Sequence, residues 1–130
     1  MYQKAILFEG PDSESAKKVL AASTPGEANK LGRAVKGYDG DVWKSKCDSI
    51  VEEGNYLKFS QSRECREALM KTKNLVLVEG SPVDRIWGIG FRGDEAVGKE
   101  DQWGLSKLGK ALMRVRERLR NEGYDEQGEK

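Results

Sequence analysis

The sequence predicts an α+β fold: a single, mostly helical domain with a small β-sheet. The chain has 130 residues, a length that suits one domain with a core of moderate size. Apolar residues recur at spacings of three and four in several segments, which is typical of helices that bury one face. The run at residues 75–78 is short, apolar and β-branched, which is typical of a buried strand. Because one strand cannot form a sheet, its partners are expected in residues 85–90 or before Met1.

The first helices are predicted from their start and stop signals. Residues 2–8 are apolar enough to be the end of a helix, which Gly10 and Pro11 then break. Asp12 or Ser13 can cap the helix that follows.

A third helix has the clearest start. Thr24 can cap it, Pro25 suits its first position, and Glu27 completes a capping box. This helix is expected to run to about Val35, and a loop over residues 36–40 follows it.

The remaining helices are longer or more regular. Asp41 opens one of them, and Ser62 starts the next. Residues 91–103 are rich in glycine and charge and are predicted to be a loop. A last helix covers roughly residues 105–121.

These elements predict one domain over residues 1–122 and a flexible tail over residues 123–130. No apolar run approaches the length of a membrane-spanning helix, and the start of the chain lacks the pattern of a signal peptide. We therefore expect a cytoplasmic protein without a membrane partner.

The composition excludes several classes of chemistry. Lysine and arginine number 23 against 22 acidic residues, so bulk charge does not indicate a duplex-binding protein. The chain has no histidine, which excludes Ser–His and Cys–His catalysis. Two separate cysteines, Cys47 and Cys65, indicate a reducing compartment and no zinc site.

The segment from Val83 to Gly90 is the hardest to explain as scaffold. Loops commonly present functional groups at the end of a strand. Gly88 and Gly90 allow a ligand to approach the backbone closely, and Trp87 offers a flat ring for stacking. A tight turn with a capping aspartate and a core tryptophan explains the same spacing equally well.

Asp84 is the best carboxylate candidate for chemistry. Cleavage of a glycosidic bond passes through an oxocarbenium-like state, and a nearby carboxylate can stabilise its positive charge or activate water. The alternative is an Asx-turn or an ion pair with Arg85, which is the commoner role of such an aspartate.

Three other features carry weaker signals. Trp43 can form the wall of a base pocket, although a core position beside Cys47 explains its spacing better. Lys4 matters only if it is desolvated, because a neutral amine can attack an aldehyde such as that of ring-opened ribose. The basic face of the last helix is interpreted as a solvated surface rather than a phosphate site. Its charged residues are Lys107, Lys110 and Arg114.

The string SPVDRIWGIG at residues 81–90 strongly resembles the signature of the NADAR (YbiA-like) family. The match covers nearly the whole chain, from Tyr2 to about Leu119, and the ordered set is more specific than any single motif. The other matching pieces are YQKA at residues 2–5, VW at 42–43, KFSQ at 58–61 and LGKALMRVR at 108–116.

The resemblance implies a helical α+β fold and N-glycosidase chemistry without a cofactor or metal. Family members are linked to hydrolysis of unstable riboflavin-pathway intermediates and to removal of ADP-ribose from guanine bases. The expected partner is a small ribosyl or ADP-ribosyl substrate, and ADP-ribosylated nucleic acid is an alternative carrier of it. The oligomeric state is not implied.

The resemblance also implies roles for individual residues. By motif position, Asp84 and Lys4 are the catalytic residues, and Lys4 lies beside the ribose. The implied ligand-binding residues are Gln3, Trp43, Trp87, Gly88 and Gly90.

Two departures from the family pattern bear on function. Family members carry a glutamate a little before the Gln-Lys pair, preceded by short strands, and Met1 stands in place of that segment. Ser106 stands where the family pattern has asparagine. Two alternatives to an active N-glycosidase therefore stay open. One is a non-catalytic member of the family that binds ADP-ribose or a nucleotide without cleaving it. The other is an incompletely folded fragment that self-associates through the open edge of its strand.

Overall fold

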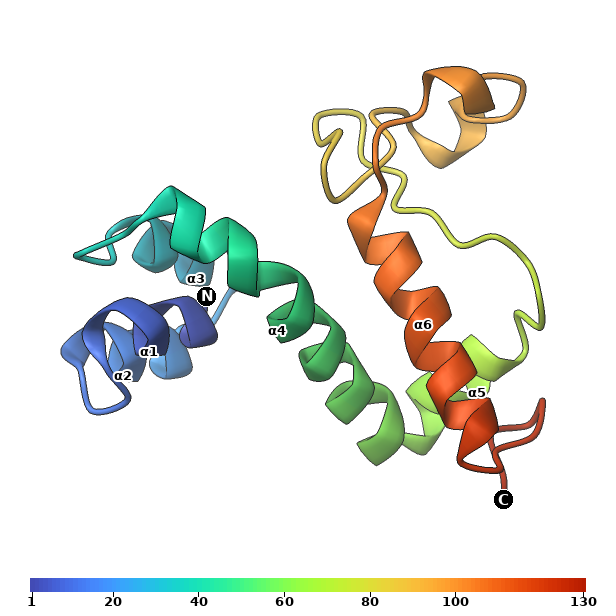
Figure 1. The fold of residues 1–130 in the computed structure, drawn as a ribbon, viewed down its shortest axis with the longest axis horizontal. Helices are drawn as coiled ribbons and strands as arrows, with labels where there is room; N and C mark the ends of the chain where they lie inside the picture. The colour runs from blue at the N-terminus through green and yellow to red at the C-terminus, as the bar shows by residue number, and fades with distance from the viewer. The chain divides into compact units, whose positions relative to one another are not determined.

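Helices are the only regular secondary structure in a computed structural model that describes residues 1–130 (Figure 1). The predicted α+β class, with its small β-sheet, is therefore wrong. The elements in order are α1 (Tyr2–Glu9), α2 (Glu14–Ala21), α3 (Pro25–Arg33), α4 (Gly40–Gln61), α5 (Arg63–Met70), the 3₁₀ helices η1 (Gly93–Glu95) and η2 (Glu100–Gln102), and α6 (Lys107–Asn121).

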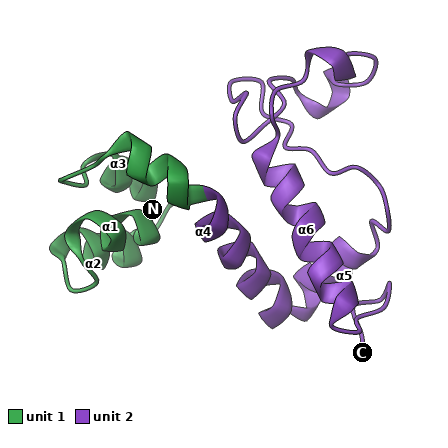
Figure 2. Cartoon of the chain, viewed as in Figure 1, with its two compact units in different colours: residues 1–47 green, residues 48–130 purple.

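The helices belong to two compact units, residues 1–47 and residues 48–130 (Figure 2). Unit 1 contains α1, α2, α3 and the start of α4, and unit 2 contains the rest of α4 and all later elements. None of the helices is both long enough and apolar enough to cross a membrane.

Unit 1 begins its helices where the sequence predicts them. The Ser13 hydroxyl accepts from the Ala16 amide at 3.2 Å, and the Thr24 hydroxyl accepts from the Glu27 amide at 3.1 Å. The Glu27 carboxylate accepts from the Ser23 amide at 3.0 Å, one residue before the cap. The capping box is thus displaced by one residue, but it still satisfies amides at the helix start.

Small residues fill the core of unit 1. Ala5 and Ala16 are fully buried, and Val35 lies beside them. Aromatic and branched side chains of α1 cover this centre from the side: Tyr2, Ile6 and Phe8. Small residues at the centre let α1 and α2 approach each other closely.

Unit 2 has a core of larger side chains. Leu69 and Met70 of α5 pack against Val115 and Leu119 of α6. Helix α6 was expected to bury Leu105, Leu108, Leu112, Val115 and Leu119, and only Val115 and Leu119 of these are fully buried. The other buried positions of the helix are Gly109, Ala111 and Arg116. Partly buried residues complete the cluster: Tyr56, Phe59, Leu77, Leu112 and Tyr124.

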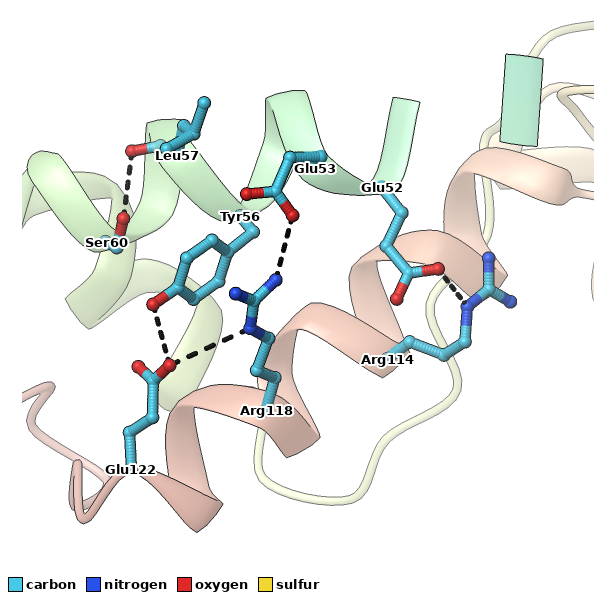
Figure 3. A network of polar contacts seen from close by, with 8 residues as sticks. All are labelled: Glu52, Glu53, Tyr56, Leu57, Ser60, Arg114, Arg118 and Glu122. Atoms are coloured by element: carbon cyan, nitrogen blue, oxygen red, sulfur yellow. Dashed lines mark hydrogen bonds and ion pairs between the residues drawn. The ribbon is translucent and has the colours of Figure 1, made fainter. Parts of the chain in front are cut away.

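Ion pairs join the second part of α4 to α6 (Figure 3). Arg114 donates to Glu52 at 2.7 Å, and Arg118 donates to Glu53 at 3.0 Å. These side chains are substantially exposed, so each pair contributes only about 0.2–1 kcal/mol. The pairs fix the orientation of the two helices more than they stabilise the unit.

Tyr56 adds an aromatic contact to this network (Figure 3). Its hydroxyl donates to Glu122 at 2.6 Å, and the guanidinium of Arg118 lies 3.3 Å from the centre of its ring. The hydrogen bond to the Glu122 carboxylate raises the pKa of the Tyr56 hydroxyl above its ordinary value.

Residues 75–78, which were predicted to be a strand, have no regular secondary structure. No neighbouring strand lies beside them, and the amides of Val76, Leu77 and Val78 make no hydrogen bond. They are not buried on both faces as expected, since Leu75 and Val76 are 68 % and 69 % exposed. A β-strand requires backbone hydrogen bonds to a neighbouring strand, and no other segment of the chain forms them with residues 76–78.

The C-terminal residues fold back onto α5. Arg66 donates to the carbonyl oxygen of Gly128 at 2.8 Å, and Arg63 pairs with Glu129 at 2.8 Å. The domain boundary after residue 122 stays a prediction.

Candidate active site

The loop of residues 81–90 rests on the start of α6. Carbonyl oxygens of residues 85–89 accept hydrogen bonds from amides of residues 104–108, at distances of 2.8 to 3.2 Å. The amides of Lys107 and Leu108 belong to the first turn of α6, where N–H groups have no partner within the helix. The loop therefore caps α6, and its backbone is fixed by that helix.

Asp84 holds this loop together from within. One carboxylate oxygen accepts from the amides of Ile86 at 2.9 Å and Trp87 at 2.8 Å. Its carbonyl oxygen accepts from the amide of Gly90 at 3.1 Å. Asp84 thus makes the Asx-turn that the sequence offered as its alternative role.

The same contacts make Asp84 a stable anion. The hydrogen bond from the Trp87 amide, with smaller contributions from the Ile86 and Gly88 amides, lowers the pKa of the carboxyl group below its ordinary value. Desolvation opposes this shift and is the weaker effect overall. A carboxylate of low pKa is a weak base but a persistent negative charge.

Two glycines are required by the geometry of the loop. A Cβ atom on Gly88 would lie 2.7 Å from the carbonyl oxygen of Asp84 and 3.0 Å from the Cβ of Ser81. Gly90 has a φ of 77°, a conformation that side chains rarely adopt. Packing alone accounts for both glycines, and their predicted contact with a ligand stays a prediction.

The side chain of Trp87 lines a cavity of about 210 Å³ in unit 2. Another part of the lining, called here the cationic wall, comes from α6 and carries the side chains of Lys107, Lys110 and Arg114. The lining residues besides Trp87 are Asp48, Leu105, Lys107, Lys110 and Arg114. The structure therefore brings the basic face of the last helix to the predicted tryptophan, so its interpretation as a solvated surface is incomplete.

Two of the cations have acidic partners. Lys107 donates to Asp48 at 3.0 and 3.3 Å, and its ammonium lies 5.6 Å from the centre of the Trp87 ring. Arg114 is paired with Glu52. Lys110 makes no ion pair or side-chain hydrogen bond, so its charge is available to an anionic ligand.

Ser106 connects the loop to the segment before it. It is 6 % exposed with a φ of 48°, and its hydroxyl accepts from the amide of Glu79 at 3.2 Å. Asparagine is enriched in this left-handed conformation, which gives a backbone reason for the asparagine of the family pattern. Serine keeps the conformation and uses its hydroxyl on the backbone.

The other predicted site residues lie in unit 1. Lys4 is half-buried on α1, and its ammonium lies 4.3 Å from the centre of the Tyr38 ring. Gln3 is exposed on the same helix, and Trp43 is partly exposed in the first turn of α4. The Tyr38 ring is held in turn by an edge-on contact with Phe8, at 5.4 Å between ring centres.

The sequence analysis named the three cations but interpreted them as a solvated face, and it did not connect them or Leu105 with Trp87. The spacing of three and four between Lys107, Lys110 and Arg114 does place them on one helix face, but spacing cannot tell what faces them. The structure gathers no group of three or more His, Cys, Asp or Glu side chains that could hold a metal ion.

Comparison with known proteins adds an independent observation. The sequence profile of the NADAR domain matches residues 1–120. N-glycosidase R617 of Acanthamoeba polyphaga mimivirus is 41 % identical over 119 residues, which cover 90 % of this chain and 69 % of that protein. N-glycosidase Npun_R5314 of Nostoc punctiforme is 37 % identical over 121 residues, which cover 92 % of this chain and 72 % of that protein.

The chain is also similar, at lower identity, to a protein named for riboflavin biosynthesis. The chloroplastic riboflavin biosynthesis protein PYRR of Zea mays is 32 % identical over 126 residues. The aligned stretch covers 91 % of this chain but 19 % of that protein. The similarity therefore concerns one part of a much longer relative.

Proposed function

The chain belongs to the NADAR domain family, and we propose that it is an N-glycosidase that hydrolyses the bond between a ribosyl carbon and a nitrogen atom. Two relatives that match most of the chain are named N-glycosidases. The observation that carries the proposal is the ionised Asp84 carboxylate, fixed by backbone amides next to Trp87, whose ring lines a cavity.

Asp84 acts as an electrostatic stabiliser. As the ribosyl–nitrogen bond breaks, positive charge develops on the sugar, and a fixed carboxylate lowers the energy of that state. Because the amides of Ile86 and Trp87 hold the carboxylate in one orientation, little reorganisation is needed during the reaction. The lowered pKa of Asp84 favours this role over that of a general base.

The cavity lining supports a phosphorylated substrate. The Trp87 ring offers a surface for a base or sugar, and the three cations of α6 exceed the acidic partners Asp48 and Glu52 by one charge. An ADP-ribosylated guanine and a phosphoribosyl intermediate of the riboflavin pathway both combine a ribosyl–nitrogen bond with phosphate. Lys110 is the residue that engages the phosphate.

Lys4 engages the sugar in this proposal. Its amine forms an imine with the aldehyde of ring-opened ribose, which releases water and is later hydrolysed. To form the imine, the Lys4 amine must leave its position over the ring of Tyr38. Gln3 and Trp43 are proposed as further ligand-binding residues from their positions in the family motifs.

A specific observation also favours a second function, binding of the same ligand without cleavage. Glycosidases generally use two carboxylates around the bond. Asp48 is the one carboxylate in the lining of the cavity, and it is occupied by Lys107. A protein with a single free carboxylate would still bind ADP-ribose or a nucleotide.

The two functions are separated by incubation of the protein with ADP-ribosylated guanine DNA and, separately, with a riboflavin-pathway ribosylamine phosphate. Released base and sugar are measured by mass spectrometry for the wild type and for Asp84→Asn. The side-chain carbonyl oxygen of Asn can still accept from the backbone amides of Ile86 and Trp87. This change therefore removes the negative charge and keeps the turn. Asp94→Asn in the same unit is the matched control, since Asp94 lies exposed beside Arg92.

Release that Asp84→Asn lowers by about 10²-fold or more, and that Asp94→Asn leaves unchanged, supports the glycosidase. Equal release by both variants contradicts the role of Asp84. No release, together with a melting temperature that rises with ADP-ribose, supports the binding protein, because a ligand of the native state raises its apparent stability. Lys110→Gln weakens binding in either case, and Lys30→Gln in unit 1 serves as its control.

A further inference from the structure

Two cations of the cavity beside Trp87 are paired with carboxylates from another helix. Lys107 donates to Asp48 at 3.0 and 3.3 Å, and Nε of Arg114 donates to Glu52 at 2.7 Å. Both carboxylates belong to the part of α4 that lies in unit 2, and Figure 3 shows the contact between Glu52 and Arg114. The chain itself therefore supplies anions to two of the three residues of the cationic wall.

These two ion pairs differ from their neighbour by their place at the cavity. Asp48, Lys107 and Arg114 all line it. Arg118 and Glu53 form a third pair between the same two helices, at 3.0 Å, and neither of them belongs to the lining. Asp48 and Glu52 thus hold the side chains that an anionic ligand in the cavity would use.

The third cation gives a ligand its first contact. Lys110 has no acidic partner among the ion pairs of the chain, and it lies between Lys107 and Arg114 on one face of α6. At a rise of 1.5 Å per residue, the three positions span about 10 Å along the helix. A phosphate group that binds Lys110 therefore approaches both of its neighbours.

A phosphate group competes well with a carboxylate for these neighbours. It carries up to two negative charges and three acceptor oxygens, whereas a carboxylate has one charge and two oxygens. The existing pairs are partly exposed to water, since the side chains of Asp48 and Arg114 are 55 % and 51 % exposed. Exposed ion pairs contribute little to stability, so their exchange for phosphate contacts is favourable.

We propose that Asp48 and Glu52 pair with the cations of the cavity when no ligand is bound, and that the phosphate groups of the ligand displace them. The inference rests on the proposed function in one respect, the phosphorylated ligand. Asp48 and Glu52 are specificity-determining residues in this arrangement. An anion with a single charge gains nothing by replacing a carboxylate, while a phosphorylated ligand gains charge and hydrogen bonds with each exchange.

Titration calorimetry with inorganic pyrophosphate tests the displacement without any need for turnover. Asp48→Asn and Glu52→Gln are each expected to bind pyrophosphate about two- to fivefold more tightly than the wild type, which corresponds to removal of one exposed ion pair. Glu53→Gln is the matched control, because it removes an ion pair between the same helices but outside the cavity. Its affinity is expected to equal that of the wild type.

Three results would overturn the proposal. Weaker binding by Asp48→Asn would show that Asp48 positions Lys107 for the ligand. An equal gain in Glu53→Gln would show a general effect of net charge, and a failure of every variant to bind pyrophosphate would show that the cations form no anion site. These results leave the glycosidase proposal to be judged by released base. Tight binding by displacement without released base would keep this inference and contradict the glycosidase.

A measurement on the wild type needs no variant to fold. The ¹³C signals of the Asp48 and Glu52 carboxylates are expected to move toward those of a solvated carboxylate as pyrophosphate is added. The signal of Glu53 is expected to stay, because its partner Arg118 lies outside the cavity lining. Carboxylate signals of Asp48 and Glu52 that do not change at saturating pyrophosphate would contradict the displacement.

Discussion

The two units hold their candidate site residues in different ways. In unit 2, Asp84 and Trp87 belong to a loop whose amides and carbonyl oxygens are bonded to one another and to the start of α6. In unit 1, Lys4 and Trp43 are partly exposed side chains on helices, and Lys4 is oriented by the ring of Tyr38. Backbone hydrogen bonds fix an atom more narrowly than a contact of one long side chain with a ring.

Under the proposed function, this difference corresponds to a division of tasks. A group that stabilises charge must be held in place before the reaction, and the loop of unit 2 does this for Asp84. A lysine that forms an imine must be able to move, and a long side chain held by a weak contact can do so. Changes to unit 2 should therefore have larger effects than changes to the contacts of Lys4.

The largest effect is expected in the core beneath α6. Leu119 is fully buried, so Leu119→Ala should lower the free energy of unfolding by about 2–5 kcal/mol through lost burial and a cavity. Urea denaturation measures it. The buried apolar residues of unit 1 are smaller than leucine. Val35→Ala should therefore lower the free energy of unfolding by less, because fewer buried atoms are removed. A larger cost for Val35→Ala would reverse the comparison.

The next effect is expected in the loop. Gly88→Ala places a Cβ atom 2.7 Å from the carbonyl oxygen of Asp84, and overpacking of this kind costs about 1–3 kcal/mol. Stability and turnover should fall together, because the added Cβ atom displaces the same loop that holds the Asp84 carboxylate in position. Gly26→Ala in α3 is the control, since no atom lies within 4 Å of its added Cβ. Unchanged stability in Gly88→Ala would show that the loop yields easily.

A smaller effect is expected from the charge of Asp84. Its pKa is lower in the folded chain than in the unfolded chain, so it stabilises the fold above the unfolded value of about 3.9. This stabilisation is lost as the pH falls through the lower folded value. The difference in unfolding free energy between wild type and Asp84→Asn should therefore shrink below about pH 4. Thermal unfolding from pH 3 to pH 7 measures it, and a constant difference would contradict the assigned hydrogen bonds.

The smallest effect is expected in unit 1. Tyr38→Leu removes the ring from beneath the Lys4 ammonium, and an exposed contact of this kind is worth about 0.5–1 kcal/mol. Tyr38 is 50 % exposed, so little burial is lost with it. Chemical denaturation detects the change, with Tyr124→Leu as a comparison in unit 2, where Arg66 lies over the ring. A loss much above 1 kcal/mol would mean that the edge-on contact between Tyr38 and Phe8 contributes as well.

The helices could be predicted from sequence because their signals are local. Ser13, Thr24 and Ser62 each accept from an amide three residues later, which a short stretch of sequence is enough to specify. The signature at residues 81–90 was likewise recognisable, and its glycines have the close contacts that such a loop requires.

The site could be predicted only in part. Trp87 and Asp84 were singled out from the loop, but the cationic wall of the same cavity was interpreted as a solvated face. Lys110 lies more than twenty residues further along the chain, and nothing in its own neighbourhood distinguishes it from a solvated lysine. Its place in the cavity depends on how the loop caps α6.

The sequence of this protein thus determined its helices, its family and the residues of one loop, because helical hydrogen bonds and turn contacts join positions a few residues apart. The tertiary structure decided the rest. Residues 75–78 have the composition of a strand, yet a strand requires a neighbour at hydrogen-bonding distance, and the folded chain supplies none. The cavity beside Trp87 likewise exists only where the loop and α6 meet, since its walls come from distant parts of the chain.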